Sequence, residues 1–250
     1  TAEMIKYVSN SLLATMISFS NEIGNMCSAV PGVDARLVWK GVHLDRRLTP
    51  INGQVGGAAG VTEYLWHGLG FGGSCFPKDV AALRSFGRTV GEQTRMLDAV
   101  LDINTDQPLR MVALLEKELS LAGKTVAVLG LAFKPGTDDL RESPALPLVA
   151  ELRKKGAKVL VHDPIAMPHA KKRPEFRDVV FAEEWAEALR KSDACCLVTA
   201  WPEYRNIQPT NFQKLMTRAL VIDGRGVLEP AAMAAAGVVW RGVGYTPEST

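Results

Sequence analysis

The feature that most constrains the fold is a series of short apolar segments that alternate with helical patterns in the second half of the chain. The apolar segments read as buried strands at residues 125–130, 157–162, 194–199 and 219–223. Helical patterns fall between them at residues 145–155, 185–191 and 211–216. Alternation of this kind predicts a right-handed, doubly wound parallel sheet. Ligands of such sheets bind outside the carboxyl ends of the strands.

The first half of the chain predicts helices instead. Apolar residues recur at three and four positions over residues 2–29, a shorter helix is expected at 33–42, and a second long helical pattern covers 90–119. Pro108 can kink or divide that second pattern. Glycine without any hydrophobic period predicts a loop at 49–60. Long apolar helices of this kind favour self-association into a homodimer or larger oligomer. We expect a helical domain at 1–121 and an α/β domain at 122–250.

Composition narrows the classes of function. The 250 residues are 47% hydrophobic, which is typical of a globular protein. Their net charge of +2 is close to neutral and argues against nucleic acid as a partner. The four cysteines show no C-x-x-C spacing, so neither a disulfide framework nor a metal site is expected. No apolar run reaches the length of a membrane span and no signal peptide opens the chain. These features predict a cytoplasmic protein without a membrane partner.

The candidate for chemistry is the stretch that surrounds Cys75. A glycine-rich approach precedes it, and Pro77 suits the first turn of a helix, so Cys75 is expected near a helix N-terminus. That position and the nearby Lys78 both favour the thiolate, which is the nucleophilic form. Asp79, four residues on, can share a helix face with Cys75 and serve as its acid/base partner. The other three cysteines are expected to be small buried apolar residues: Cys27, Cys195 and Cys196.

The same glycines raise a competing interpretation. Gly68, Gly70 and Gly73 satisfy the string G-x-G-x-x-G, which can bind dinucleotides. That motif requires a strand before it and a helix that opens on its last glycine. Here Trp66 and His67 come before the string and a cysteine and a proline come after it, so we reject the dinucleotide interpretation.

Other polar residues carry weaker signals. Lys6 and Asn10 are four apart on one helix and can project together, although spacing alone favours two solvated residues. In the long loop after the first strand, Lys134 and Arg141 could meet a phosphorylated ligand, as could Arg225 after the fourth strand. Salt bridges with neighbouring acids are an equally good interpretation of that loop. Asp163 is interpreted as ending its strand rather than binding a ribose.

Together these segments resemble the UDP-glucose/GDP-mannose dehydrogenase family. Residues 2–10 look like the start of its central helical dimerisation domain, 72–79 like its catalytic-cysteine motif, and 130–144 like the first loop of its nucleotide-sugar domain. Residues 199–205 and 223–225 add two later matches in the same order. The resemblance implies a helical dimerisation domain followed by a Rossmann-like doubly wound sheet.

It also implies a reaction, namely oxidation of the sugar C6 alcohol to a carboxylate by NAD through a thiohemiacetal and a thioester on Cys75. Lys6 and Asn10 match the residues that stabilise developing oxygen charge, and Asp79 matches the one that assists water. The resemblance assigns nucleotide-sugar contacts to the following residues: Arg47, Tyr64, Leu65, Trp66, His67, Gly68, Gly72, Phe133, Lys134 and Arg225. Of these, Arg47 looks like an arginine that reaches the substrate from a partner subunit. Lys78 and Arg141 match contacts to NAD.

Two further expectations follow from the resemblance. Members that act on N-acetylhexosamines carry a histidine before the cysteine, whereas this chain has Ser74. Residues 80–108 look more like the UDP-glucose members than the GDP-mannose ones, so UDP-glucose is the expected substrate and GDP-mannose the alternative. The family's N-terminal NAD-binding Rossmann domain is absent, so we expect a fragment that is inactive alone. A non-catalytic module that dimerises and holds a nucleotide sugar is the competing hypothesis.

Overall fold

The computed structural model describes residues 1–48 and 60–246, so the predicted loop at 49–60 lies outside the described residues except for Gly60. The described chain forms two compact units. The first contains residues 1–107 together with 244–246, and the second contains residues 108–243. The division lies at 107/108, whereas the sequence placed a domain boundary at 121/122.

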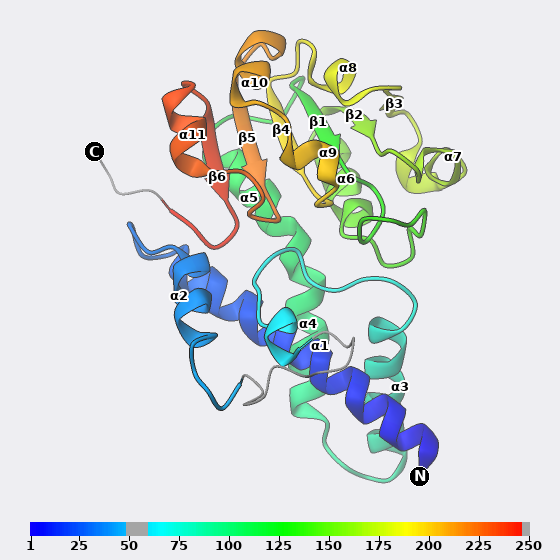
Figure 1. The fold of residues 1–250 in the computed structure, drawn as a ribbon. Helices are drawn as coiled ribbons and strands as arrows, with labels where there is room; N and C mark the ends of the chain where they lie inside the picture. Colours follow the sequence, from blue (N-terminus) through cyan, green and yellow to red (C-terminus); the bar gives the residue numbers. More distant parts are fainter. Residues whose placement is uncertain (49–59, 247–250) are drawn as a thin grey trace. The chain divides into compact units, whose positions relative to one another are not determined.

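The first unit is helical and is organised around one long helix, α1 (Ala2–Cys27) (Figure 1). Helices α3 and α4 pack against it, and the buried side chains of Ala14, Phe71, Val80 and Val100 form their shared core. A second cluster joins Trp39 and its neighbours to the end of α1. Besides α1, the elements of this unit are α2 (Ala35–Val42), η1 (Val61–Tyr64), α3 (Phe76–Thr89) and α4 (Arg95–Asp106).

The prediction of one helical pattern over residues 90–119 is wrong in its first part. Helix α3 continues through residue 89, and Gly91 then adopts a φ of 83°, a conformation that favours glycine and ends the helix. Helix α4 starts afresh at Arg95. Pro108 does divide the rest of the pattern, because it lies in a 3-10 turn, η2 (Gln107–Leu109), between α4 and α5 (Arg110–Glu116).

The second unit contains a six-stranded sheet in the order β3-β2-β1-β4-β5-β6, with every pair parallel. Its strands are β1 (Thr125–Leu129), β2 (Lys158–His162), β3 (Val180–Phe181), β4 (Ala194–Leu197), β5 (Leu220–Asp223) and β6 (Val239–Gly242). The four predicted strands are confirmed. The edge strands β3 and β6 were missed because β3 has two residues and β6 alternates half-buried with buried positions. Strand order reverses between β1 and β4, which is the topological switch point of this sheet.

Helices cover both faces of the sheet (Figure 1). Helix α6 packs on β2 and on α5, whereas α8 packs on β1 and β2 and against α10. The helices of this unit that follow α5 are α6 (Ala145–Lys154), α7 (Met167–Ala170), η3 (Pro174–Phe176), α8 (Trp185–Leu189), α9 (Pro202–Arg205), α10 (Pro209–Leu215) and α11 (Pro230–Ala235). Throughout the described part of the chain, no helix combines the length and apolarity needed to cross a membrane.

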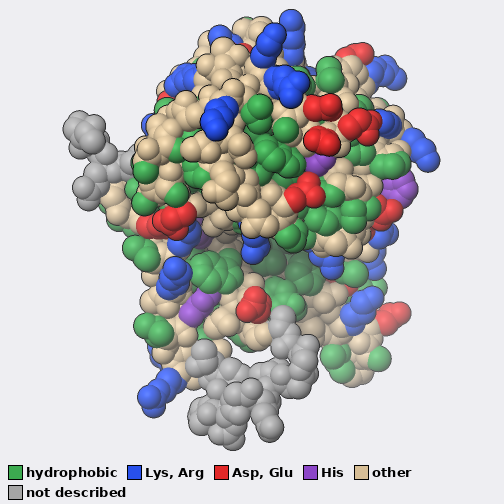
Figure 2. Space-filling view, turned by 45° about the horizontal axis from the view of Figure 1, so that its top comes forward, with side chains coloured by type: hydrophobic (Ala, Val, Ile, Leu, Met, Phe, Trp, Pro, Cys, Tyr) green, Lys and Arg blue, Asp and Glu red, His purple; other side chains and the backbone are tan. Residues whose placement is uncertain are grey.

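Charged side chains of both signs are interspersed on the surface. Figure 2 shows basic and acidic groups mixed with apolar ones over the visible face. In residues 1–48 and 60–246, no three histidine, cysteine or acidic side chains come together as a metal site would require.

Candidate functional site

Cys75 occupies the N-cap position of α3, and Pro77 lies in the first turn of that helix, as the sequence predicted. The side chain is exposed, whereas Cys27, Cys195 and Cys196 are buried. The first helical hydrogen bond runs from the Asp79 N–H to the Cys75 carbonyl at 2.8 Å. Cys75 is therefore the one cysteine of the chain that a solvent-borne molecule can reach.

Asp79 is fully buried and contacts both Asn10 and Lys78. Its Oδ2 accepts a hydrogen bond from Asn10 Nδ2 at 2.6 Å, and its Oδ1 lies 3.0 Å from Lys78 Nζ. Burial acts to raise the pKa of the Asp79 carboxyl, but the bonds from Asn10 and Lys78 and the charges of Lys78 and Lys6 outweigh it. The pKa therefore lies below its usual range, and Asp79 is ionised at neutral pH.

Residues Gly68–Gly73 form a segment without regular secondary structure that leads to Cys75, and we call this segment the strap. A 3-10 turn rather than a strand precedes it, and the next helix opens at Phe76, which agrees with rejecting a dinucleotide motif. Its backbone is held by side-chain amides that the sequence analysis missed: Asn21, Asn104 and Gln107. Asn21 is a buried amide on α1, whereas Asn104 and Gln107 stand among acidic and polar neighbours and gave no distinctive signal in the sequence. Gly72 is half-buried and, as a glycine, has no side chain that could block a molecule from reaching Cys75.

The segment before the strap contains four of the expected sugar contacts. Tyr64 packs against Phe76 with ring centroids 6.2 Å apart, beside the cysteine. Trp66 meets the edge of His43 at 4.8 Å and is 37% exposed. Leu65 is buried, with its carbonyl 3.1 Å from His43 Nε2.

His67 and Arg47 differ in how tightly they are held. His67 is packed so closely that a Cβ on Gly24 or on Gly244 would collide with it. Arg47, by contrast, is 88% exposed at its side chain and pairs with Asp45.

In the second unit, the loop at 130–144 is fixed at the carboxyl end of β1. Asp163 Oδ2 accepts from the N–H groups of Leu131 and Ala132 and from Trp201 Nε1, and its Oδ1 accepts from two more backbone N–H groups. Thr199 Oγ1 donates to the Ala132 carbonyl at 2.6 Å. Asp163 thus holds backbone, in agreement with the rejection of a ribose-binding role.

Phe133, Lys134 and Arg225 lie at this same edge of the sheet. Lys134 Nζ is 5.4 Å from the centroid of the Phe133 ring. Arg225 Nε donates to the Val198 carbonyl at 2.7 Å, which places its guanidinium at the end of β4. Burial lowers the pKa of Arg225 to about 10, and the charge of Asp223 opposes this, so the group stays protonated at neutral pH. Cations thus follow β1 and β5, with β4 between them.

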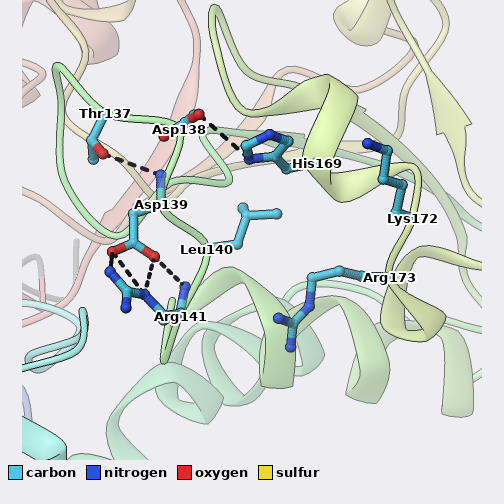
Figure 3. A pocket seen from close by; sticks show the side chains of 8 residues that line it. All are labelled: Thr137, Asp138, Asp139, Leu140, Arg141, His169, Lys172 and Arg173. Carbon is cyan, nitrogen blue, oxygen red and sulfur yellow. Dashed lines mark hydrogen bonds and ion pairs between the residues drawn. The ribbon is translucent and has the colours of Figure 1, made fainter.

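Arg141 borders a surface hollow of about 580 Å³ (Figure 3). Its Nη2 lies 2.8 Å from Asp139, in a fork that also uses Nε. Across the hollow, His169 Nδ1 is 3.4 Å from Asp138. Figure 3 shows Lys172 and Arg173 lining the opposite side, after α7. The salt-bridge interpretation therefore describes Arg141, whereas Lys134 and Arg225 pair with no carboxylate within the described chain.

Comparison with known proteins gives matches along most of the chain. Residues 1–106 match the central domain and residues 127–230 the UDP binding domain of the UDP-glucose/GDP-mannose dehydrogenase family. UDP-glucose 6-dehydrogenase AglM of Haloferax volcanii is 43% identical over 91% of this chain and 49% of its own length. UDP-glucose 6-dehydrogenase TuaD of Bacillus subtilis is 39% identical over 98% of this chain and 50% of its own.

A solved structure shares the fold. The UDP-glucose dehydrogenase of Pyrobaculum islandicum superposes with a TM-score of 0.82 at 38% identity, covering 97% of this chain and 51% of that one. The chain therefore spans about half the length of the relatives it matches.

Proposed function

Because this chain belongs to the UDP-glucose/GDP-mannose dehydrogenase family, we propose that it is the central and UDP-binding part of an NAD-dependent UDP-glucose 6-dehydrogenase. The observation that carries the proposal is the exposed Cys75 thiol one helical turn from a buried Asp79 carboxylate bound by Asn10 and Lys78. The reaction is oxidation of the C6 alcohol of UDP-glucose to the carboxylate of UDP-glucuronate.

In this proposal the C6 alcohol would first lose a proton and a hydride, the latter to NAD, to give the aldehyde. The Cys75 sulfur then attacks that aldehyde and forms a thiohemiacetal, and transfer of a second hydride to a second NAD would give a thioester. Asn10 Nδ2 uses one hydrogen on Asp79 and retains a second, which can donate to the developing oxyanion. Lys6 is exposed on the same helix and adds positive charge. Asp79 then orients the water that hydrolyses the thioester, since the exposed Lys78 ammonium can yield its place at Oδ1 to that water.

The nucleotide end of the substrate is assigned to the sheet edge. Lys134 and Arg225 offer cationic donors at the switch point between β1 and β4, where sheets of this type bind ligands. Arg225 suits a diphosphate because its guanidinium can bind two oxygens at once. Relatives named UDP-glucose 6-dehydrogenases at 43% and 39% identity support UDP-glucose over GDP-mannose.

NAD, when bound, would accept the hydride in each oxidation. Lys78 and Arg141 are exposed cations that fit its phosphates. The described residues contain no strand–glycine turn–helix of the dinucleotide type, so these two contacts do not make a complete NAD site. We therefore propose that NAD binding requires contacts beyond Lys78 and Arg141.

We also propose a homodimer formed through α1. An exposed apolar stripe repeats every seven residues along that helix at Ile5, Leu12, Phe19 and Met26. A seven-residue apolar repeat is typical of a helix that packs against another helix. Arg47 is exposed, and its guanidinium has more N–H donors than Asp45 alone can accept from. In such a dimer it would reach the partner's substrate.

Calorimetric titration with UDP-glucose, GDP-mannose and NAD in parallel tests the proposal. We expect UDP-glucose to bind, NAD to give no heat, and Arg225→Ala to weaken UDP-glucose binding about tenfold by removing the guanidinium–phosphate contact. The matched control is Arg177→Ala, an exposed arginine of the same unit, which should bind as the wild type does. Preferential binding of GDP-mannose would overturn the substrate assignment.

A further inference from the structure

The strap is held by side chains in a way that resembles strand pairing. Asn104 Oδ1 accepts from the Phe71 N–H at 2.7 Å, and Asn104 Nδ2 donates to the Phe71 carbonyl at 3.1 Å. Both backbone groups of Gly68 are also bound by amides: Asn21 Oδ1 accepts from its N–H at 2.7 Å, and Gln107 Nε2 donates to its carbonyl at 2.8 Å. Both polar backbone groups of these two strap residues are thus bound by amides.

A carboxamide suits the Asn104 contact. It carries a donor and an acceptor in one planar group, whereas a carboxylate only accepts and an ammonium only donates. The fit is also close, since a Cβ on Gly70 would lie 2.3 Å from Asn104 Oδ1. Gly70 has a φ of 82°, which independently favours glycine. Strap and amide are therefore matched to each other.

The position of the strap is passed on to the cysteine through packing. Phe71 is buried in a core that includes Val80 of α3. Its ring also meets the edge of Phe76 with centroids 6.0 Å apart, and Phe76 is the residue next to Cys75. Moving the strap would therefore move the first turn of α3, which carries both the thiol and Lys78.

We propose that Asn104 and Gln107 are positioning residues that clamp the strap and thereby fix the Cys75 thiol, at the start of α3, relative to Asn10 and Lys6 of α1. Neither amide touches Cys75, so both act through the strap. Lys78 lies on the same first turn of α3 as Cys75 and moves with it, so the clamp preserves the position of the thiol relative to α1, where Asn10 binds Asp79 and the charge of Lys6 acts on that carboxylate. The inference rests on the proposed function only in taking Cys75 as the nucleophile.

Alkylation of the native protein measures the charge that acts on the thiol. Cys75 is the exposed cysteine among the four, so the rate reports on its thiol. Iodoacetate is an anion and iodoacetamide is neutral, and the ratio of their rates rises when cations lie near the sulfur. At low salt we expect this ratio to fall about threefold in Asn104→Ala, the effect of moving the thiol away from about one unit charge on α1. Lys6→Gln should lower the ratio similarly, which calibrates the measurement.

Two further variants make the result decisive. Thr105→Ala changes an exposed neighbour on the same helix whose hydroxyl bonds only within it, and its ratio should equal that of the wild type. Asn104→Ser is the milder change at the clamp and should give an intermediate ratio. An unchanged ratio in an Asn104 variant that circular dichroism shows to be folded would overturn the proposal.

Loss of stability alone leaves the ratio in the folded protein unaffected, so the assay separates positioning from a purely structural role. The assay contains neither nucleotide sugar nor NAD. Failure of UDP-glucose to bind would therefore refute the proposed function without altering this result.

Discussion

The strap before Cys75 and the loop after β1 are both held by side chains that hydrogen-bond to their backbone, but the side chains differ in chemistry. Each is an irregular segment that must present a functional group, and each has backbone polar groups that no helix or sheet satisfies. The strap is bound by neutral amides, which pair with an N–H and a carbonyl of the same residue. The loop is bound by the carboxylate of Asp163, which accepts five hydrogen bonds and donates none.

The difference comes from the polar groups that each backbone presents. The loop turns the N–H groups of Leu131 and Ala132 toward one point, so a single anion satisfies both. The strap presents donors and acceptors alternately, so it needs several bifunctional side chains. These N–H groups of Leu131 and Ala132 are therefore bound by one residue, whereas the backbone groups of the strap are bound by three. Substitutions should expose that contrast.

The largest effect is expected at Asp163. Replacing it by alanine leaves four backbone N–H groups and the Trp201 indole without an acceptor in a buried place, and we expect the free energy of unfolding to fall by about 3–5 kcal/mol. Urea unfolding followed by circular dichroism measures this. Asp138→Ala, an exposed acid of the same loop, is the control and should change stability by less than about 0.5 kcal/mol.

A smaller loss is expected at the strap. Gln107→Ala removes one of three holding amides, so we predict a decrease of about 1–3 kcal/mol in the same unfolding experiment. If this loss equalled or exceeded that of Asp163→Ala, the contrast between binding by one residue and binding by three would be wrong.

pH provides a third test, confined to the second unit. Burial lowers the pKa of His162 below its ordinary value of 6.5, against the raising effect of Asp163 and other nearby acids. The unfolded chain then binds the proton more readily, so stability is full above pH 6.5 and declines as pH falls through that value. The slope from this one group is at most about 1.4 kcal/mol per pH unit. His162→Gln should remove this part of the slope in unfolding curves measured between pH 7 and pH 5.

The smallest effect is expected at Arg47. Its ion pair with Asp45 is exposed, so Arg47→Ala should change the free energy of unfolding by less than about 0.5 kcal/mol. A larger loss would show that Arg47 supports the helical unit itself, which would contradict its assignment to the substrate of a partner subunit.

The sequence predicted the parts of the site that depend on local spacing. Pro77 located the start of α3, and the interval from Cys75 to Asp79 placed the thiol and the carboxylate one turn apart. Spacing alone favoured two solvated residues at Lys6 and Asn10, and only the resemblance gave a role to Asn10, whose amide contacts Asp79. Four strands were predicted because they are buried on both faces and therefore continuously apolar.

Contacts between distant segments could not be predicted in this way. Asn21 and Gln107 meet at Gly68 only after α1 and α4 have packed, and neither has a distinctive neighbourhood in the sequence. Asp163 was interpreted correctly as structural, but its bonds to residues 131 and 132 depend on the pairing of β1 with β2. Strand β3 is too short to produce any periodic signal.

The most direct measurement of the central claim is the rate at which Cys75 is alkylated with and without UDP-glucose, located by peptide mapping. If Cys75 is the nucleophile for a substrate held by Arg225, saturating UDP-glucose should slow alkylation of Cys75 several-fold, and Arg225→Ala should abolish that protection at the same concentration. Alkylation of Cys75 at an unchanged rate while UDP-glucose is bound would contradict the account.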